Sequence, residues 1–150
     1  MSELARREGY TISTDPRHLD VGAVHRYLSG ESYWAAGVPR RTLEKAIAGS
    51  LNFGLYAGEP GGTLAGYARV VTDRATFAWL CDVFVLPAHR GRGLGVWLME
   101  VVMAHPDLQE LRNFLLATRD AHGLYARFGF TPLEEPARWM AIRRRPASYA

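Results

Sequence analysis

The chain has 150 residues, of which 48% are hydrophobic and 22% are charged. This composition is ordinary for a globular domain and excludes an intrinsically disordered chain, collagen and a coiled coil. The length predicts a single domain over residues 1–150, with ends at about 1–8 and 143–150 that we expect to be flexible. The formal net charge is +3, and Lys45 is the one lysine among the 18 basic residues, so the basic side chains are almost all arginines.

The sequence also excludes several kinds of site and partner. No apolar run approaches the roughly 18 residues of a membrane helix, and the N-terminus has no apolar signal region, so we expect a cytoplasmic protein with no membrane partner. The single cysteine, Cys81, excludes an internal disulfide, and the five histidines show no metal-binding spacing. The arginines cluster only at 143–145, close to the C-terminus, so nucleic acid is not an expected partner.

The secondary structure follows from the spacing of apolar residues, which has a period of two in strands and about 3.6 in helices. Glycines, prolines and N-cap residues mark the ends of the elements. In chain order, we first expect a strand at 10–14, a helix that Asp20 caps and that carries Val21, Val24 and Leu28, and a second helix at 39–47. A hairpin of strands at 51–57 and 64–72 follows, then a long strand at 75–86 and a helix that runs from the glycine-rich stretch at 90–95 to His105. The last elements are a short strand at 113–117, a brief helix that Asp120 caps and Gly129 ends, and a strand at 139–142. This mixture predicts one α/β domain with a mixed sheet.

The most informative stretch is ArgGlyArgGlyLeuGly at 90–95, between the long strand and a helix. Its glycines permit backbone angles and close approaches that a Cβ would bar. Consecutive N–H groups can then face one anion, and the helix N-terminus adds unpaired donors and a positive dipole end. The turn therefore predicts a pyrophosphate cradle, to which Arg90 and Arg92 can add charge-assisted contacts. The alternative is a turn that only packs strand against helix.

Three motifs in one order carry a family resemblance. The turn has no Gly-Lys-Ser/Thr of a Walker loop, and Val96 breaks the dinucleotide fingerprint. Arg-x-x-Gly-x-Gly from Arg90 to Gly95 instead resembles the signature of the GCN5-related N-acetyltransferase (GNAT) family. CysAspValPheValLeuPro at 81–87 is similar to the family's fourth strand, and LeuTyrAlaArgPheGlyPhe at 124–130 is similar to its Tyr-x-x-x-Gly-Phe element.

The resemblance implies a fold, a co-substrate and a reaction. The fold is a central, mostly antiparallel twisted sheet of about six or seven strands, flanked by about four helices. The reaction is direct transfer of the acetyl group of acetyl-CoA to a primary amine of a small molecule or peptide, with no metal. A bulge in the fourth strand is implied to aim a backbone N–H at the thioester carbonyl, as an oxyanion donor. The implied cofactor-binding residues are Val83, Phe84 and Val85 through their backbone, and Arg90, Gly91, Arg92, Gly93, Leu94, Gly95 and Val96 at the turn.

Tyr125 is the leading catalytic side chain, because it matches the family tyrosine that protonates the leaving thiolate. Tyrosine has an ordinary pKa of about 10 and a thiol one of about 8.5, so a neutral phenol can donate as charge develops on sulfur. A tyrosine that only packs beside the cofactor is the alternative.

Asp82 is the candidate base, and it matches a family aspartate. In a strand of period two it shares one face with Leu80 and Phe84. Burial tends to raise the pKa of an acid, which would suit a proton acceptor working through water. A structural aspartate is the alternative reading, since buried charges are normally paired. Cys81 stands where some relatives have a glutamate, so a glutamate base is not carried over, and a buried core cysteine is favoured over a nucleophile.

The acceptor is expected opposite the cofactor, between the first two helices and the strands, as in the family. The expected lining is aromatic and short of carboxylates: Ser32, Tyr33, Trp34, Phe53, Tyr56, Arg69, Phe77, Trp79 and Trp139, with Tyr33, Trp34, Arg69, Phe77 and Trp79 as the main substrate-binding candidates. This composition argues against polyamines, and Arg69, Arg40 or Arg41 could clamp a carboxylate. A non-catalytic acyl-CoA-binding sensor or interaction module is the alternative function, since fold does not fix function. A homodimer is one option for the assembly.

Overall fold

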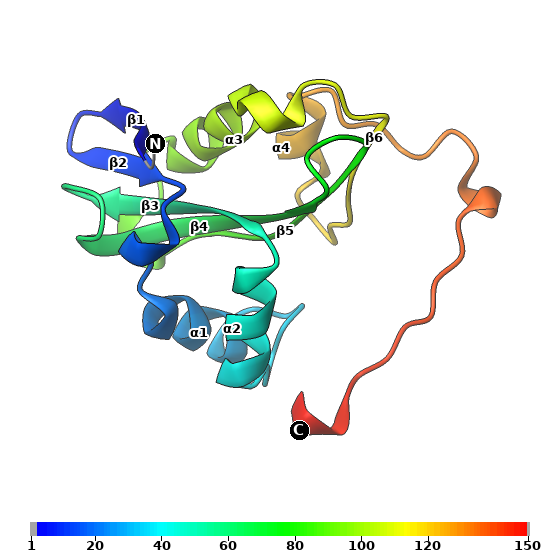
Figure 1. Cartoon of the computed structure of the whole chain (residues 1–150), viewed down its shortest axis with the longest axis horizontal. Coiled ribbons are helices and arrows are strands. Elements are labelled where there is room, and N and C mark those ends of the chain that lie inside the picture. The colour runs from blue at the N-terminus through cyan, green and yellow to red at the C-terminus, as the bar shows by residue number, and fades with distance from the viewer. Residues whose placement is uncertain (1–2, 150) are drawn as a thin grey trace.

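The computed structural model describes residues 3–149 and has a central sheet with helices on both faces (Figure 1). The strands are β1 (Glu3–Arg7), β2 (Tyr10–Ser13), β3 (Leu51–Ala57), β4 (Thr63–Thr72), β5 (Phe77–Val85) and β6 (Asn113–Leu116). The helices are α1 (Val21–Gly30), α2 (Arg40–Ala48), α3 (Leu94–Ala104) and α4 (His122–Ala126), and single-turn 3-10 helices lie at Pro16–His18, Pro87–His89, Pro106–Leu108, Pro136–Arg138 and Ala147–Tyr149. No helix within the described range is both long and apolar enough to cross a bilayer.

The strands lie in the sheet in the order of the sequence, from β1 to β6. Neighbouring strands are antiparallel as far as β5, whereas β5 and β6 are parallel. Parallel neighbours need a crossover, and the segment that contains α3 provides it. This arrangement confirms the predicted mixed, mostly antiparallel sheet with helices around it.

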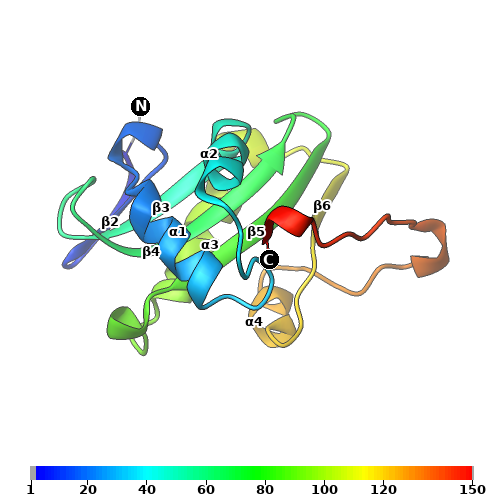
Figure 2. The same cartoon turned by 90° about the horizontal axis from the view of Figure 1, so that it is seen from below.

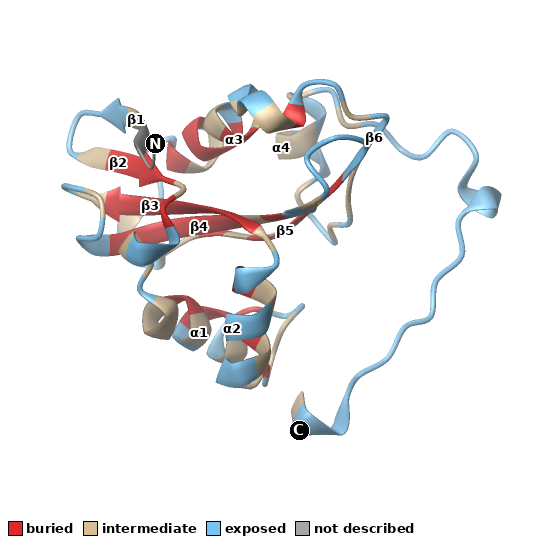
Figure 3. Cartoon of the chain, in the orientation of Figure 1, coloured by how far each residue is buried: buried red, intermediate tan, exposed pale blue. Residues whose placement is uncertain are grey.

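Helices α1 and α2 cover one face of the sheet, and α3 and α4 cover the other (Figures 1 and 2). Two apolar cores result, one on each face. On the α3 side, Phe53 of β3 packs with Leu98 of α3. On the other side, Tyr67 of β4 and Phe84 of β5 pack with α1 and α2. The most buried residues lie along the central strands (Figure 3), so the sheet is the rigid centre of the molecule.

Residues 3–7, which we expected to belong to a flexible end, form strand β1. The strand returns into β2 through Gly9, whose φ of 80° is readily available only to glycine. β1 lies at the sheet edge, and the guanidinium of Arg6 forms two hydrogen bonds of 3.0 Å with the carboxylate of Glu59. Charged residues are common on edge strands and mask the apolar alternation from which strands are predicted.

The prediction of a last strand at 139–142 is wrong. Residues 131–149, here called the tail, follow α4, run away from the sheet and come back on the side of α1 and α2 (Figures 1 and 3). Met140 is 96% exposed and Ile142 is 81% exposed. A strand needs a neighbour for its backbone hydrogen bonds, and no other strand of the described chain pairs with this segment. Near its end, Arg145 donates to the carbonyl of Ala36 over 3.1 Å.

These positions predict opposite outcomes for two truncations. Leu98 is fully buried between α3 and the sheet, whereas Met140 is almost fully exposed. Leu98→Ala should therefore lower the free energy of unfolding by about 2–5 kcal/mol because it leaves a cavity. Met140→Ala should change this free energy by less than about 0.5 kcal/mol. Urea unfolding measures both, and an equal loss in the two variants would contradict this placement of the core.

Candidate active site

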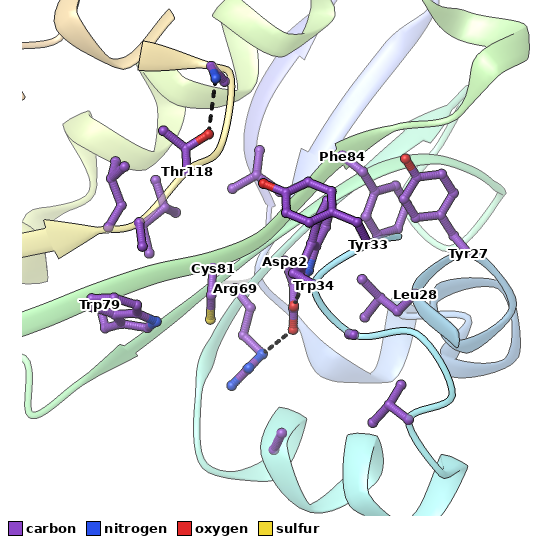
Figure 4. Close-up of a pocket in the computed structure, with 18 of the residues that line it drawn as sticks. Tyr27, Leu28, Tyr33, Trp34, Arg69, Trp79, Cys81, Asp82, Phe84 and Thr118 are labelled. Atoms are coloured by element: carbon purple, nitrogen blue, oxygen red, sulfur yellow. Dashed lines mark hydrogen bonds and ion pairs between the residues drawn. The ribbon is translucent and has the colours of Figure 1, made fainter. Parts of the chain in front are cut away.

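A cavity of about 590 Å³ opens where β5 parts from β6 (Figure 4). The two strands pair from Phe77 and Asn113 to Leu80 and Leu116, so the rest of β5 has no partner on that side within the described chain. The walls of the cavity come from α1 and the loop that follows it, α2, β4, β5, residues 116–121, α4 and the tail. β5 therefore has a free edge from Cys81 to Val85 within the described chain.

Most of the main acceptor candidates line this cavity. They are Tyr33, Trp34, Arg69 and Trp79. On the donor side, Val83, Phe84, Val85 and Arg90 also line it, as do both proposed catalytic residues, Asp82 and Tyr125. Sequence reasoning missed Tyr27, Thr42, Arg143 and Tyr149, which the fold adds to the lining. Arg143 and Tyr149 lie on the irregular tail, where no periodicity signals which side chains turn inward.

Four of the expected aromatic residues lie elsewhere. Phe77 begins β5 beside Asn113, at the end of the strand where the sheet is still closed; it is 39% exposed and is not part of the cavity lining. Phe53 and Tyr56 are fully buried in the two cores. Trp139 is on the tail beside a second, more polar cavity of about 520 Å³. Aromatic residues serve packing as readily as binding, which explains these positions.

Strand β5 contains a bulge at Asp82 and Val83. Arg69 of β4 pairs with Cys81 and Tyr67 pairs with Phe84, so two residues of β5 oppose one residue of β4. Asp82 has a φ of 53°, in the left-handed region that aspartate tolerates better than most residues. A bulge leaves its extra residue out of the backbone ladder. It also reverses the alternation of side chains along the strand.

The reversal corrects the predicted face pattern of β5. Leu80 packs in the core on the α3 side, whereas Phe84 packs in the core of α1 and α2. A regular period of two would place both side chains on one face, as the sequence predicted. Because of the bulge, Trp79 and Cys81 line the cavity before it and Phe84 lines the same cavity after it (Figure 4).

The carboxylate of Asp82 bridges two side chains. Its Oδ1 accepts from the indole Nε1 of Trp34 over 2.9 Å, and its Oδ2 accepts from Nε of Arg69 over 2.8 Å. Nη1 of Arg69 also donates to Oγ of Ser50 over 3.0 Å. Burial alone would lower the pKa of Arg69, but the charge of Asp82, its hydrogen bond and other nearby acidic groups together outweigh burial and hold this pKa above its usual value. The bridge therefore joins β4, β5 and the loop after α1 through a buried charge pair.

Tyr125 and Cys81 are both held in their neutral forms. Burial raises the pKa of Tyr125 to about 12. Burial also raises the pKa of Cys81 to about 12, and the positive charge of the nearby Arg69 offsets this rise only in part. A protonated thiol is a poor nucleophile, so the cavity offers a phenol that can donate a proton but no thiolate. No group of three His, Cys, Asp or Glu side chains suited to a metal occurs in residues 3–149.

The segment before α4 differs from expectation at its cap. Asp120 does not cap the helix, because its carboxylate pairs with Arg119 over 3.2 Å. Oγ1 of Thr118 instead accepts from the backbone N–H of Ala121 over 3.1 Å (Figure 4). The guanidinium of Arg119 lies 3.9 Å from the ring centre of Tyr33, whose hydroxyl accepts from the backbone N–H of Arg119. The loop after α1 is thus tied to the loop before α4.

The glycine-rich turn presents a row of free donors. Gly91 and Gly93 have φ of 79° and 74°, and a Cβ at either would meet no atom within 4 Å. No N–H of residues 91–96 donates to another group in the described part of the chain. Arg90 braces the turn, donating to the Val85 carbonyl over 2.9 Å and to the Tyr27 hydroxyl over 3.2 Å. Left-handed glycines, open space and the start of α3 together give the arrangement of donors that an anion-binding site requires.

The buried bridge predicts the stability of two variants. Asp82→Asn keeps a residue that tolerates the left-handed backbone but leaves Arg69 without its charged partner. The free energy of unfolding should fall by about 3 kcal/mol. Trp34→Phe keeps a ring and removes one hydrogen bond, so it should cost about 1 kcal/mol. Urea unfolding tests both variants, and an Asp82→Asn variant as stable as the unaltered protein would show that the bridge does not stabilise the fold.

The chain is similar to known acetyltransferases along most of its length. The sequence model of the acetyltransferase (GNAT) domain matches residues 52–132. The crystal structure of a candidate GNAT-family acetyltransferase from Xanthomonas campestris pv. campestris superposes with a TM-score of 0.86 and 52% identity, covering 94% of this chain and 96% of that one. A candidate acetyltransferase of Gibberella zeae, FG08082, is 35% identical over 81% of this chain and 78% of its own length.

A plant relative has a more specific name. Serotonin N-acetyltransferase 2, chloroplastic, of Oryza sativa subsp. japonica is 32% identical to this chain and is matched over 95% of this chain and 72% of its own length. The matched domain spans the β5 bulge, the glycine-rich turn and Tyr125. Sequence, fold and these three features agree, and the chain belongs to the GNAT acetyltransferase family.

Proposed function

We propose that this protein transfers the acetyl group of acetyl-CoA directly to a primary amine. The observation that carries the proposal is that a row of unpaired N–H groups and an uncharged phenol flank the same bulged strand. The N–H groups of residues 91–96 follow β5, and Tyr125 faces the cavity that β5 lines. An anion-binding turn suits the pyrophosphate of coenzyme A, and a phenol suits protonation of a leaving thiolate.

The donor end binds through backbone atoms. The turn at 91–96 would hold the pyrophosphate, with the side chain of Arg92 beside it. The free edge of β5 at Val83, Phe84 and Val85 would pair with the amides of the pantetheine arm, because β6 has already diverged there. When bound, acetyl-CoA supplies the activated acetyl group as a thioester. The bulge at Asp82 and Val83 releases backbone donors that can stabilise the oxyanion.

The proton steps fall to Tyr125 and to solvent. Tyr125 remains a phenol at neutral pH because its pKa is about 12, so it can donate to the sulfur as the thioester breaks. Both oxygens of Asp82 already accept hydrogen bonds, from Trp34 and Arg69. We therefore assign Asp82 a positioning role at the bulge, in place of a role as base. The amine enters uncharged or loses its proton to water.

The acceptor side offers flat aromatic surfaces. Trp79, Trp34 and Tyr33 line the cavity, and the rice relative is named for an aromatic amine, serotonin. Aromatic side chains contribute large contact areas with specific geometry. We infer that a primary amine with a planar or apolar body fits this chain's cavity better than a polyamine.

A thiol-release assay separates this proposal from its alternative. Acetyl-CoA is mixed with the protein and a panel of primary amines, and free coenzyme A is measured. Amine-dependent release supports an acetyltransferase. Binding of acetyl-CoA without release by any amine in the panel would favour a non-catalytic acyl-CoA sensor or interaction module with the same fold.

The free N–H row predicts that a negative charge at Gly93 weakens cofactor binding. Gly93→Asp tolerates the left-handed backbone but places a repelling carboxylate at the anion site, so affinity for acetyl-CoA should fall at least about tenfold, or about 1.4 kcal/mol. Gly9→Asp is a matched control, since Gly9 also has a left-handed φ and open space around its Cβ position. Calorimetry measures both affinities. Unchanged affinity in a folded Gly93→Asp variant would move the cradle elsewhere.

The position of Tyr125 predicts a loss of rate without a loss of binding. Tyr125→Phe keeps the ring that packs against Phe130 but removes the proton donor, so kcat should fall by about 10²–10⁴-fold. Tyr56→Phe is the control, since it removes a buried hydroxyl outside the cavity that has no partner in the described chain. Thiol release under conditions where chemistry limits the rate measures both variants.

The pH profile provides a second measurement on Tyr125. A general acid acts while it is protonated, so its contribution is lost only as the pH rises through about 12. Between about pH 7 and 10 the rate should therefore rise, as the acceptor ammonium loses its proton, without a falling limb from Tyr125. A Tyr125→Phe rate within a fewfold of the unaltered rate would leave Tyr125 as a packing residue.

A further inference from the structure

The acidic side chains that face the cavity are all engaged. Among the described residues they are Asp82 and Asp120. Each oxygen of Asp82 accepts a hydrogen bond from Trp34 or Arg69, and Asp120 pairs with Arg119 at the exposed rim. An acceptor with several ammonium groups would therefore find no free carboxylate.

Two cationic side chains that line the cavity, Arg69 and Arg143, keep donors without a hydrogen-bond partner among the described residues. Arg69 donates from Nε to Asp82 and from Nη1 to Ser50, while its Nη2 has no partner among the described residues. The side chain of Arg69 is only 16% exposed. Arg143 of the tail also lines the cavity, and no hydrogen bond or ion pair engages its guanidinium within residues 3–149. Arg69 therefore offers directed donors, and Arg143 adds a positive charge that no acid balances.

The free donors of Arg69 lie next to the reactive stretch of β5. Arg69 pairs across the sheet with Cys81, immediately before the bulge at Asp82. Figure 4 shows the Arg69, Cys81 and Trp79 side chains on the side of β5 that faces α2. Because Asp82 fixes Nε, the guanidinium plane is held in place before any ligand arrives. A largely buried donor without a partner is costly, and Nη2 can donate a charge-assisted hydrogen bond to a carboxylate oxygen.

We propose that the acceptor carries a carboxylate in addition to its primary amine, and that Nη2 of Arg69 binds this carboxylate with Arg143 as the second cation. This inference rests on the proposed acetyl transfer for the identity of the amine. Trp79 contacts the body of the acceptor, and the amine points along β5 toward the bulge. The substrate class is thus an amino acid or a related amino carboxylate.

Paired acceptors test the proposal. Phenylalanine is compared with phenethylamine and 4-aminobutanoate with butylamine, and spermidine represents the polyamines. In at least one pair, kcat/KM by thiol release should favour the carboxylate member by about 10- to 100-fold, the worth of a charge-assisted hydrogen bond. The pair with the larger preference gives the spacing between amine and carboxylate. If the simple amines or spermidine react better in every comparison, acetyl transfer stands and the carboxylate site is overturned.

Variants of Arg69 and Arg143 test whether these two residues cause the preference for acceptors with a carboxylate. Arg143→Gln should raise KM for the preferred carboxylate about tenfold and leave its uncharged partner unchanged. Arg144→Gln is the matched control, because it removes the same charge one residue away from the lining, and it should have no effect. Arg69→Lys keeps a cation beside Asp82 but removes Nη2, so the preference should fall to within about threefold. A preference that survives both Arg143→Gln and Arg69→Lys overturns the assignment.

A binding measurement separates this inference from the proposed function. Calorimetry with coenzyme A present compares 3-phenylpropanoate, a carboxylate without an amine, with 3-phenylpropan-1-ol. Binding of the carboxylate at least about tenfold tighter, with the difference lost in Arg69→Lys, supports the site even if no amine is acetylated. Equal binding of the two compounds overturns it, whatever the thiol-release assay shows.

Discussion

The geometry of the site depends on the buried charge of Asp82. Its backbone adopts a left-handed conformation, with a φ of 53°, that few residues other than glycine accept. The hydrogen bonds from Arg69 and Trp34 offset the cost of this conformation and of burying a carboxylate. The resulting bulge reverses the side-chain pattern of β5. It thereby gives the cavity a wall from Trp79 and Cys81 before the bulge and from Phe84 after it.

The proposed donor site and the proposed acceptor site are built by different means. At the donor end, glycines and the first turn of α3 present main-chain N–H groups, so a short local sequence suffices to form the site. At the acceptor end, the walls are side chains from α1, the strands, the loops and the tail. This difference explains why the co-substrate can be inferred from six consecutive residues and the acceptor only from the folded chain.

The sequence predicted the features that repeat or are local. The hairpin of β3 and β4, the long strand β5, the helix after the turn and the mixed sheet all follow from periodicity and turn residues. The bridge at Asp82 could not be predicted in this way, because the partners of its carboxylate, Arg69 and Trp34, are 13 and 48 residues away in the sequence. A bulge also reverses the alternation of side chains along a strand, and this alternation is the basis for predicting which face of the sheet each residue lies on. The segment 139–142 has the composition of a strand, but strand formation needs a neighbour that composition does not supply.

Outside the apolar cores, the loop after α1 contacts three separate parts of the chain. Trp34 reaches β5, Tyr33 meets Arg119, and the carbonyl of Ala36 accepts from Arg145 of the tail. None of these contacts belongs to the two apolar cores or to the hydrogen-bond ladder of the sheet. Positions of the loop and the tail such as Tyr33 and Arg145 can therefore change in sequence while the central sheet and the glycine turn stay as they are, whereas Trp34 is tied to the bulge through Asp82. In a lineage descended from this protein, selection for a new acceptor would act first on those two segments, and the turn proposed to bind coenzyme A would be inherited intact.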